Sequence, residues 1–533
     1  MVAATVPADV PWLTLLIVWP LIGALLLWVL PRRAADGPTA GPRRVREIAL
    51  VVAVVELALA IGAAVVGFGG SMSDASLTGS YQLYESHAWI PQFGISYALG
   101  VNGVAMLLIL MALVLVPLVI LAAWKEQGSQ NGASNRLRHY LALVLVLTSF
   151  MVAVFAARDL FLFYVVFEAM LIPVYFMIGA FGGPQRRYAA VKFLLFSLAG
   201  GLVMLVGVIV LSLHGPGGEQ GFLISNLTGL DLGTGTGRWL FLAFFLAFAI
   251  KAPMFPVHSW LPDTAEQAPA GTSTLLVGVL DKVGTFGMLT LCLPLFPEAS
   301  RWAAPVIIAL ALVSIFYGAL LALGQQDMFR LVAYTSVSHF GFIVLGIFAF
   351  TSTSIAGSSF YMVNHGLSTG GLFLLVGFLV ARKGSARIAD FGGLQKITPV
   401  LAGTFLVVGL SALSLPGLST FVSEFLVIVG TFGTHRPAAI IAAVGVVLAA
   451  LYVLWTYQRV FTGPVRDELA ETRDLSGRER WVVGPLIALM LVLGFYPAPA
   501  LDLVNDPATI SVTQVGVADA PDLVTVGDEG SEQ

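Results

Sequence analysis

The sequence predicts an all-α polytopic membrane protein with about 14 transmembrane helices. Of its 533 residues, 58% are hydrophobic and only 11% are charged, whereas soluble domains carry roughly 25% charged residues. The mean hydropathy is +0.91, and long apolar stretches recur from one end of the chain to the other. In lipid such stretches form helices, because a helix pairs all its backbone polar groups internally.

Each predicted span is an apolar run long enough to cross a hydrocarbon core about 30 Å thick. The runs lie near 12–30, 47–68, 100–124, 140–157, 160–181, 188–213, 238–257, 271–293, 302–323, 330–350, 359–381, 400–432, 437–460 and 480–499. Only ARD (157–159) separates the fourth span from the fifth. The twelfth run is too long for one straight helix at about 1.5 Å per residue, and Pro416-Gly417 in its middle predicts a break.

The basic residues predict an orientation, because lysine and arginine collect in cytoplasmic loops. Odd-numbered connections hold most of the 27 basic residues, and even-numbered connections hold only Arg158, Arg238, Arg301 and Arg436. We therefore expect the odd loops in the cytoplasm and both termini outside it. The richness in Ala, Gly, Val and Arg, with few lysines, suggests a high-GC bacterium, and hence the bacterial inner (plasma) membrane.

Two broken spans suggest an internal repeat. Lys251 precedes two prolines in the seventh span, AIKAPMFP (249–256), and Glu424 follows the break in the twelfth, five spans later. Because five is odd, a repeat of spans 4–8 in spans 9–13 is inverted across the membrane, as in transporters with an ion site near the midplane. The expected parts are three N-terminal helices, two five-helix repeats with broken helices 7 and 12, and a last helix with an acidic outer tail, at 1–138, 139–298, 299–462 and 463–533.

Titratable side chains fall at similar depths inside the predicted spans. They are Glu168, Lys251, Lys282, His339, His365 and Glu424. A charge at a helix centre costs about 2.5–3.5 kcal/mol on insertion scales, so the set indicates proton-carrying groups arranged along the membrane plane. The alternatives are structural: Glu168 and Lys251 as an ion pair that holds helices together, and the histidines as hydrogen-bonded members of a polar core.

Prolines accompany several of these charges. A proline inside a helix removes the hydrogen bond to the carbonyl four residues earlier. Pro253 is thus expected to free the carbonyl of Ala249 beside Lys251, and Pro173 and Pro416 act similarly near Glu168 and Glu424. Free carbonyls at this depth need protein or water around them. We expect hydrated breaks, with simple kinks as the alternative.

Other charged residues give weaker signals. Lys192, early in the sixth span, can partner Glu168 or extend to the cytoplasmic edge. Glu56 is isolated in the second span. Asp281 precedes Lys282, but successive helical side chains point about 100° apart and need not pair.

The sequence predicts no cofactor and no metal site. His258, Asp263 and Glu266 have a metal-like composition but no known ligand spacing, so a proton entry or a structural loop is favoured. The single cysteine, Cys292, excludes thiolate iron–sulfur or zinc sites. Nucleotide-binding glycine motifs are missing from any strand–helix setting.

Three stretches resemble the antiporter-like subunits of respiratory complex I, the proton-pumping NADH:quinone oxidoreductase. They are KAPMFPVHSWLPDTAEQAPAGTSTLL (251–276), RLVAYTSVSHFGF (330–342) and NHGLSTGGLFLL (364–375). The similarity covers nearly the whole chain, most clearly residues 100–460. RDLFLFYVVFEAMLIPVYF (158–176) and the glutamate at 424 resemble M-type subunits, whereas the sister L and N types typically carry lysine at the latter position.

The resemblance implies a fourteen-helix core with two inverted five-helix repeats, in a subunit without redox chemistry of its own. Its implied partners are other membrane-arm subunits, especially the L and N types, and membrane lipid, with no nucleic acid and no bound nucleotide. It implies Glu168 and Lys251 as a coupling pair, Lys282 as central relay and Glu424 as the outlet, with His339 and His365 between them.

Three points remain open at the level of sequence. Asp281 departs from the apolar neighbour that the family usually places before the relay lysine. The D-type subunit of a multisubunit sodium/proton antiporter shares the fold and the glutamate of the twelfth helix, and is the nearest alternative. A solitary substrate transporter is an alternative from another class, although the sequence has no signature of a large polar substrate cavity.

Overall fold

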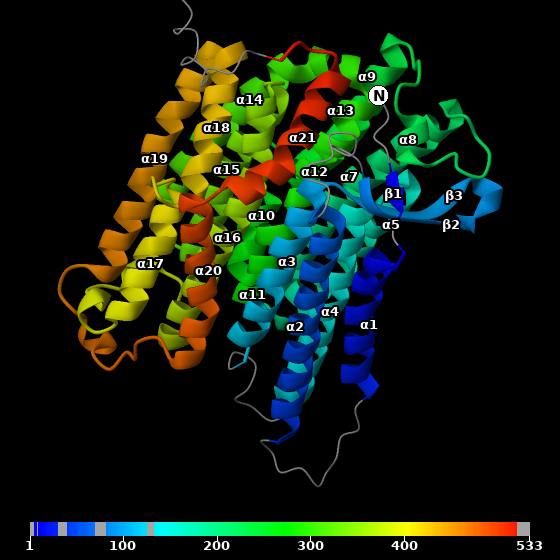
Figure 1. Cartoon of the computed structure of the whole chain (residues 1–533). Helices are drawn as coiled ribbons and strands as arrows, with labels where there is room; N and C mark the ends of the chain where they lie inside the picture. The colour runs from blue at the N-terminus through cyan, green and yellow to red at the C-terminus, as the bar shows by residue number, and fades with distance from the viewer. Residues whose placement is uncertain (1–4, 8, 30–39, 70–80, 125–132, 520–533) are drawn as a thin grey trace, which may run out of the picture.

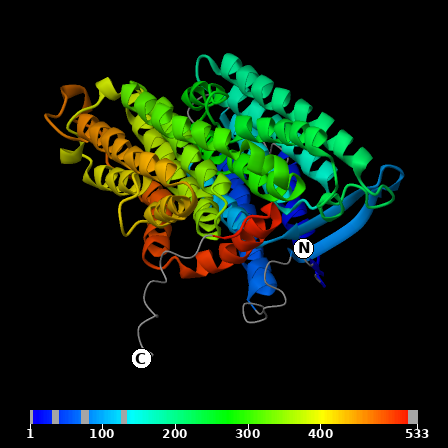
Figure 2. The same cartoon turned by 90° about the horizontal axis from the view of Figure 1, so that it is seen from above.

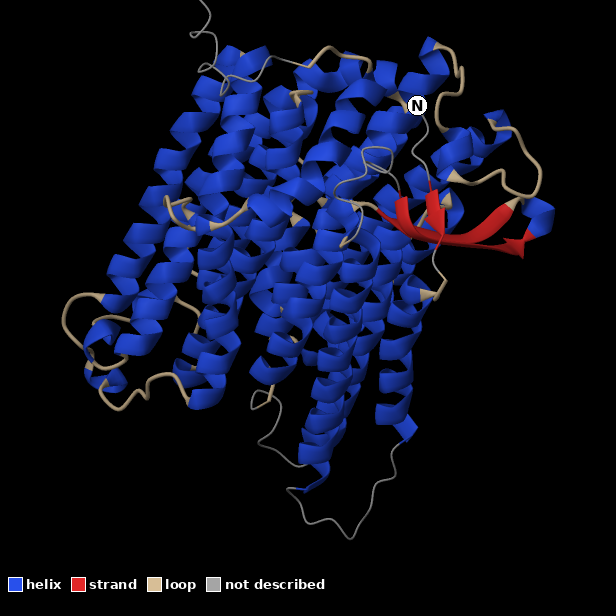
Figure 3. Cartoon of the chain, viewed as in Figure 1, coloured by secondary structure: helices blue, strands red, loops and turns tan. Residues whose placement is uncertain are grey.

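A bundle of long helices forms most of the chain in the computed structural model, which describes residues 5–7, 9–29, 40–69, 81–124 and 133–519 (Figures 1 and 3). The N-terminal half contains α1 (Trp12–Val29), α2 (Ala40–Phe68), α3 (Gly103–Ala122), α4 (Ala133–Ala156), α5 (Leu160–Ala169), α6 (Leu171–Phe181), α7 (Arg186–His214), α8 (Ile224–Leu227), α9 (Thr234–Lys251) and α10 (Trp260–Gln267). Seen from above, teal, green and then yellow and orange helices follow one another across the bundle (Figure 2).

The eighth predicted span is one apolar helix with irregular turns. It runs through α11 (Ala270–Leu275), α12 (Lys282–Gly287) and α13 (Leu293–Leu295), with π-helical turns at Leu276–Leu280 and Met288–Cys292. The remaining helices are α14 (Pro297–Gly324), α15 (Met328–Phe348), α16 (Ser352–Lys383), α17 (Pro399–Ala412), α18 (Ser419–Thr434), α19 (Arg436–Phe461), α20 (Gly477–Phe495) and α21 (Ala498–Val515). Short 3₁₀ turns occupy Pro91–Phe93, Ile388–Asp390, Leu394–Lys396 and Asp467–Leu469.

The described residues confirm a polytopic helical membrane protein. Within them, 11 helices are long and apolar enough to cross a membrane, or 12 if the bent pair α20 and α21 counts as one span. The predicted seventh and twelfth spans are not among these. The seventh is interrupted by a break after α9, and the twelfth is divided between the shorter apolar helices α17 and α18. Both breaks lie where the prolines predicted them, whereas the count of fourteen stays a prediction.

The prediction of an all-α chain was wrong in one region. Strand β2 (Tyr81–Ile90) pairs antiparallel with β3 (Ile95–Val101) and parallel with β1 (Thr5–Pro7), so the sheet has the order β1-β2-β3 (Figure 3). Gly94 closes the hairpin with φ 72°, a conformation that glycine adopts without steric cost. The Glu85 carboxylate then accepts the Leu13 backbone N–H at 2.8 Å, and so ties the sheet to the first turn of α1.

The C-terminal segment also differs from the expectation. Residues 498–515, predicted to begin an outer tail, form α21, which meets α20 at an angle of 67°. Its buried residues, Ala500, Val504, Ala508, Ser511, Val512 and Val515, recur at helical spacing. The stripe packs against α16 and α3, and the backbone of Leu503 passes so close to Gly103 that no side chain fits there.

Candidate functional site

Most of the titratable groups predicted from the sequence meet in the interior of the bundle. Lys251, Lys282, His339, His365 and Glu424 are each at most 4% exposed. They come from α9, the irregular eighth span, α15, α16 and α18. The long helix α16 packs against α11, α15 and α18, and so carries His365 between the other groups. Helix packing therefore brings together residues that lie up to 173 positions apart in the chain.

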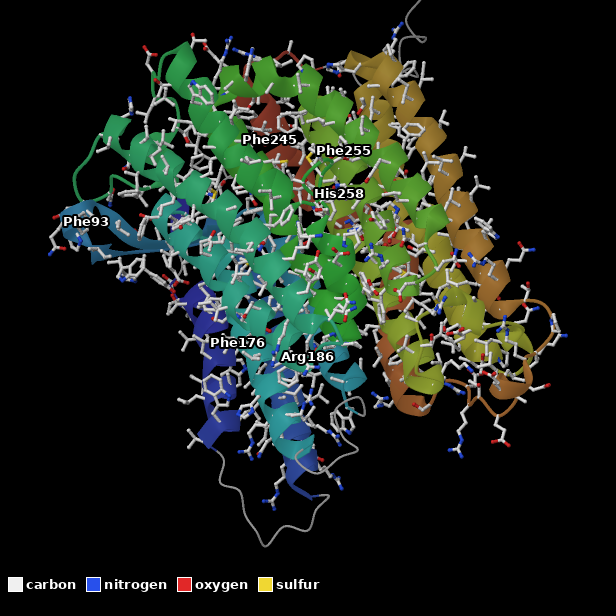
Figure 4. The ribbon with its side chains drawn as sticks, turned by 180° about the vertical axis from the view of Figure 1, so that it is seen from behind. Phe93, Phe176, Arg186, Phe245, Phe255 and His258 are labelled. Carbon is white, nitrogen blue, oxygen red and sulfur yellow. The ribbon has the colours of Figure 1, made fainter. Side chains whose placement is uncertain are left out.

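The first break follows Lys251 directly. Helix α9 ends at this residue, and the chain turns through 252–259 before α10 begins. The Trp260 indole N–H donates to the carbonyl of Ile250 at 2.9 Å and fixes the end of the helix. One expectation was wrong here: the carbonyl of Ala249 is not free, since it accepts the backbone N–H of Met254 at 3.1 Å. Figure 4 shows Phe255 and His258 in this break, close to one another.

Glu168 lies beside another interruption, between α5 and α6 at Met170. Its carboxylate packs against Gly201 of α7, where an added Cβ would lie 1.5 Å from Oε1. Glu168 interacts electrostatically with Lys251, but the two side chains form no direct ion pair. Among the described residues, neither Glu168 Oε1 nor Lys251 Nζ has a hydrogen-bond partner. The Lys251 ammonium lies over the rings of Phe167 and Phe193, at 5.3 and 5.7 Å from their centroids.

Lys282 occupies the centre of the site. The π-helical turn before it presents the carbonyl of Val277 to its ammonium at 2.5 Å, and π turns of this kind recur at functional sites. The same ammonium contacts His365 Nδ1 at 2.6 Å. Because a lysine ammonium is only a donor, His365 accepts this hydrogen bond on Nδ1 when Lys282 is protonated.

From His365 the contacts continue to the second break. The rings of His365 and His339 lie at right angles with centroids 5.2 Å apart. His339 Nε2 hydrogen-bonds to the Tyr452 hydroxyl at 3.0 Å, and the ring of Tyr361 lies 6.0 Å from that of His339. The Tyr361 hydroxyl donates to Glu424 Oε2 at 3.4 Å.

Glu424 is held by the break itself. The hydroxyl of Ser414, in the turn between α17 and α18, donates to the carboxylate of Glu424. Ser414 adopts φ 62°, a left-handed conformation that is uncommon for a residue with a side chain. The interruption thus supplies a hydrogen-bond donor to a carboxylate that is 4% exposed.

Sequence reasoning missed several members of this site. We call the whole set the buried polar row: Glu168, which is only half-buried, and the buried residues Lys251, Asp281, Lys282, His365, His339, Tyr361, Tyr452 and Glu424. Tyr361 and Tyr452 belong to apolar stretches of the sequence, where a tyrosine is ordinary. Asp281 was noted only as a neighbour of Lys282, yet it is completely buried and interacts electrostatically with both Lys251 and Lys282.

Of the two alternatives for Lys192, the pair with Glu168 is not formed, because the Lys192 ammonium binds Asp263 Oδ2 at 2.6 Å. Its extension to the cytoplasmic edge stays a prediction. Arg330 binds the other oxygen of Asp263 at 2.7 Å and Glu266 at 2.9 Å. Burial acts to raise the pKa of Asp263, but the hydrogen bonds and charges of Lys192 and Arg330 outweigh it and hold the pKa below its ordinary value. This cluster ties α7, α10 and α15 together.

Within the described part of the chain, no group of three or more His, Cys, Asp or Glu side chains is arranged to hold a metal ion. The ring of His258 instead packs against aromatic rings: it stacks on that of Phe255, with centroids 6.1 Å apart, and meets that of Tyr317 edge-on, with centroids 5.1 Å apart. The metal-like composition of this segment therefore belongs to a packed loop and an ion-pair cluster.

The fold and the site define a class: a polytopic helical membrane protein whose broken helices flank a buried row of titratable groups. Residues 157–451 match the profile of the family described as NADH:quinone oxidoreductase/Mrp antiporter, TM. NADH-quinone oxidoreductase subunit M of Mycobacterium tuberculosis is 46% identical over 96% of both chains. The chain belongs to the family of NADH-quinone oxidoreductase subunit M.

Solved structures show the same fold. A chain of respiratory complex I from Thermus thermophilus matches with a TM-score of 0.83 at 31% identity, covering 95% of this protein and 100% of that chain. A chain of the Mrp complex from Dietzia sp. matches with a TM-score of 0.81, covering 94% of this protein and 98% of that chain. The latter is only 21% identical, so it shows a shared fold and no more.

Proposed function

We propose that the protein is a proton-translocating membrane-arm subunit of an NADH:quinone oxidoreductase. It performs no redox chemistry, and it couples quinone reduction elsewhere in the complex to proton movement through the buried polar row. The observation that carries this proposal is the unbroken contact from Lys282 through His365, His339 and Tyr361 to Glu424 in the interior of the bundle. A purely structural core does not need two buried lysines, since each costs about 2.5–3.5 kcal/mol at a helix centre.

Charge is passed along this row by electrostatics and by short proton transfers. Glu168 and Lys251 form the input end, because each has a buried atom without a hydrogen-bond partner and the two side chains interact electrostatically. At an effective dielectric near 20, a unit change of charge about 6–7 Å away is worth about 2.5 kcal/mol. That suffices to load or unload Lys282, whose proton then has His365 Nδ1 within hydrogen-bond distance.

The membrane arrangement follows from the same proposal. The chain crosses the bacterial plasma membrane fourteen times, with both termini outside the cytoplasm, and residues 139–298 and 299–462 are inverted repeats. Support comes from the two breaks at corresponding places, after α9 and between α17 and α18. Its neighbours are the L- and N-type sister subunits and membrane lipid. Exposed apolar side chains on α1, α7 and α19 are suited to such neighbours.

The second candidate is the D-type subunit of a sodium/proton antiporter. The observation that favours it is the fold shared with a chain of the Mrp complex. The two candidates differ in their assemblies. Purification from native membranes together with flavin and iron–sulfur subunits, and NADH-driven proton uptake that needs no sodium, would support the first. A sodium-dependent assembly without redox subunits would support the second.

Lys251→Ala tests the role of the row within the intact complex. We expect normal assembly and normal NADH oxidation with a soluble electron acceptor, but a loss of most proton uptake in sealed vesicles and of coupled quinone turnover. Glu424→Gln is expected to act in the same direction. Full pumping by either assembled variant would refute the role of that residue.

Glu56→Gln is the matched control. Glu56 in α2 is also completely buried, and among the described residues neither of its oxygens has a hydrogen-bond partner and no charged side chain interacts with it. We expect proton uptake close to that of the unmodified complex. Equal losses in Glu56→Gln and Glu424→Gln would show that burial of a carboxylate, and not its place in the row, sets the effect.

A further inference from the structure

Asp281 is a buried carboxylate between two buried lysines. It is 0% exposed, and neither oxygen has a hydrogen-bond partner among the described residues. It interacts electrostatically with Lys251 and Lys282. A buried charge without compensation costs several kcal/mol, so the two ammonium groups are what make an ionised carboxylate tolerable at this position.

The local helix geometry explains why neighbouring residues face different partners. Asp281 shares one face with Gly284, three positions later, and an added Cβ on Gly284 would lie 2.5 Å from the backbone of Phe248 and of Ala252 in and after α9. That face therefore points at the end of α9, where Lys251 lies.

Lys282 shares the adjacent face with Thr285, whose hydroxyl contacts Met362 Sδ of α16 at 2.9 Å. On the same side Lys282 contacts His365. The π turn that precedes Asp281 is closed by a hydrogen bond in which the backbone N–H of Asp281 donates to the carbonyl of Leu276 at 3.0 Å. Asp281 thus faces the input lysine while its neighbour faces the relay histidine.

We propose that Asp281 is the shared counter-ion of Lys251 and Lys282, a positioning residue that links the input end of the row to the central relay. With both lysines protonated the three groups carry a net charge of +1, and the loss of one proton leaves them neutral. The carboxylate therefore keeps one lysine charged while the other exchanges its proton. This inference rests on the proposed function and adds a residue to it.

Asp281→Asn in the native complex tests the inference, because asparagine has the same shape without the charge. We expect assembly and NADH oxidation with a soluble acceptor to be retained, and proton uptake per NADH in sealed vesicles to fall about tenfold, as in Lys251→Met and Lys282→Met. Asp281→Glu restores the negative charge and is expected to recover part of the proton uptake. If residue 281 served only to fill space, Asp281→Asn would keep the uptake and the longer Asp281→Glu would not improve on it. Glu56→Gln again serves as the control for a buried carboxylate without charged neighbours.

The outcomes separate the inference from the proposed function. Normal pumping by Asp281→Asn, with loss in both lysine variants, overturns the role of Asp281 and leaves the proposed function standing. Normal pumping by all three variants overturns the proposed function. If Asp281→Asn does not assemble, the double variant Asp281→Asn/Lys251→Met removes a charge pair together: its assembly supports the counter-ion, and its failure to assemble overturns it.

Discussion

The position of single side chains decides what this site can do, and Glu168 is the clearest case. Its carboxylate has room only because residue 201 is glycine: an added Cβ would lie 1.5 Å from Oε1. Glycine is needed at this position because it lets the Glu168 carboxylate approach the backbone of α7 closely. Its conformational freedom is not used, since Gly201 lies inside the helix. The input end of the row is therefore set by a residue that has no charge at all.

Gly201→Ala is expected to displace the Glu168 carboxylate while leaving the complex assembled. The atom in the way is the end of a flexible side chain, so the stability cost is at the lower end of the ~1–3 kcal/mol typical of an added methyl group in a packed core. Proton uptake in vesicles should fall about tenfold, because Glu168 then no longer holds its place relative to Lys251. Gly179→Ala in α6 is the control, since its Cβ would make an ordinary contact 3.5 Å from Ala190. Equal uptake in the two variants would contradict this account.

Residue identities could be predicted from the sequence where burial of charge is costly. Lys251, Lys282 and Glu424 stand out in apolar runs, and the structure places them in one interior. Partners could not be predicted, because they depend on helix rotation. Lys192 binds Asp263 and not Glu168, and the π turn at Leu276–Leu280 changes the rotation of the helix that carries both Asp281 and Lys282. No one-dimensional pattern records such a turn.

At the scale of elements, the breaks are the predictable feature and the short elements are not. Proline and glycine have strong local effects, so the interruptions after α9 and between α17 and α18 lie where the sequence places them. The hairpin at 81–101 was missed because its strands are short beside the apolar spans that dominate the composition. Helix α21 was missed because it contains Asp502, Asp506 and two prolines and so resembles a polar tail.

The ion-pair cluster around Asp263 fastens three elements and allows a stability prediction. Asp263→Asn removes the charge that Lys192 and Arg330 share, at side chains that are 20–26% exposed. We expect a loss of about 1–2 kcal/mol at neutral pH after allowance for solvent screening, measured as a lower Tm of the purified complex. Glu468→Gln, which breaks the exposed pair with Lys383, is the control and should leave the Tm unchanged.

The difference in Tm between the unmodified complex and Asp263→Asn is expected to depend on pH, and the direction can be predicted. Lys192 and Arg330 lower the pKa of Asp263 in the folded protein, so the contribution of its ion pairs to stability is complete above the unfolded pKa and is lost as the pH falls through the folded pKa. The Tm gap between the unmodified complex and Asp263→Asn should thus be constant from pH 7 to about 5 and narrow below about 4. A gap that widens on acidification would contradict the ion-pair account.

At the scale of the whole molecule, the orientation in the membrane connects the charge pattern with the fold. The loop at 462–476 lies at one end of the bundle, whereas the segment around α8 lies toward the other (Figure 1). Arg466 and Arg473 belong to the first of these, and the basic residues predict that it is cytoplasmic. The proposed fourteen crossings put seven spans between Glu219 and Glu471, and an odd number places these two exposed residues on opposite sides.

Cysteine labelling tests this topology, because the single native cysteine, Cys292, is buried and provides a silent background. In cells that make the complete complex, a membrane-impermeant maleimide is expected to label Glu219→Cys from outside and Glu471→Cys only after permeabilisation. The test is sensitive to the broken helices. Without the spans around α9 and α17–α18 the count between the two positions is still odd, but if only one of them crosses the membrane the count is even. Labelling of both positions from one side would therefore mean that one broken span re-enters the side it came from, and it would overturn the inverted repeat.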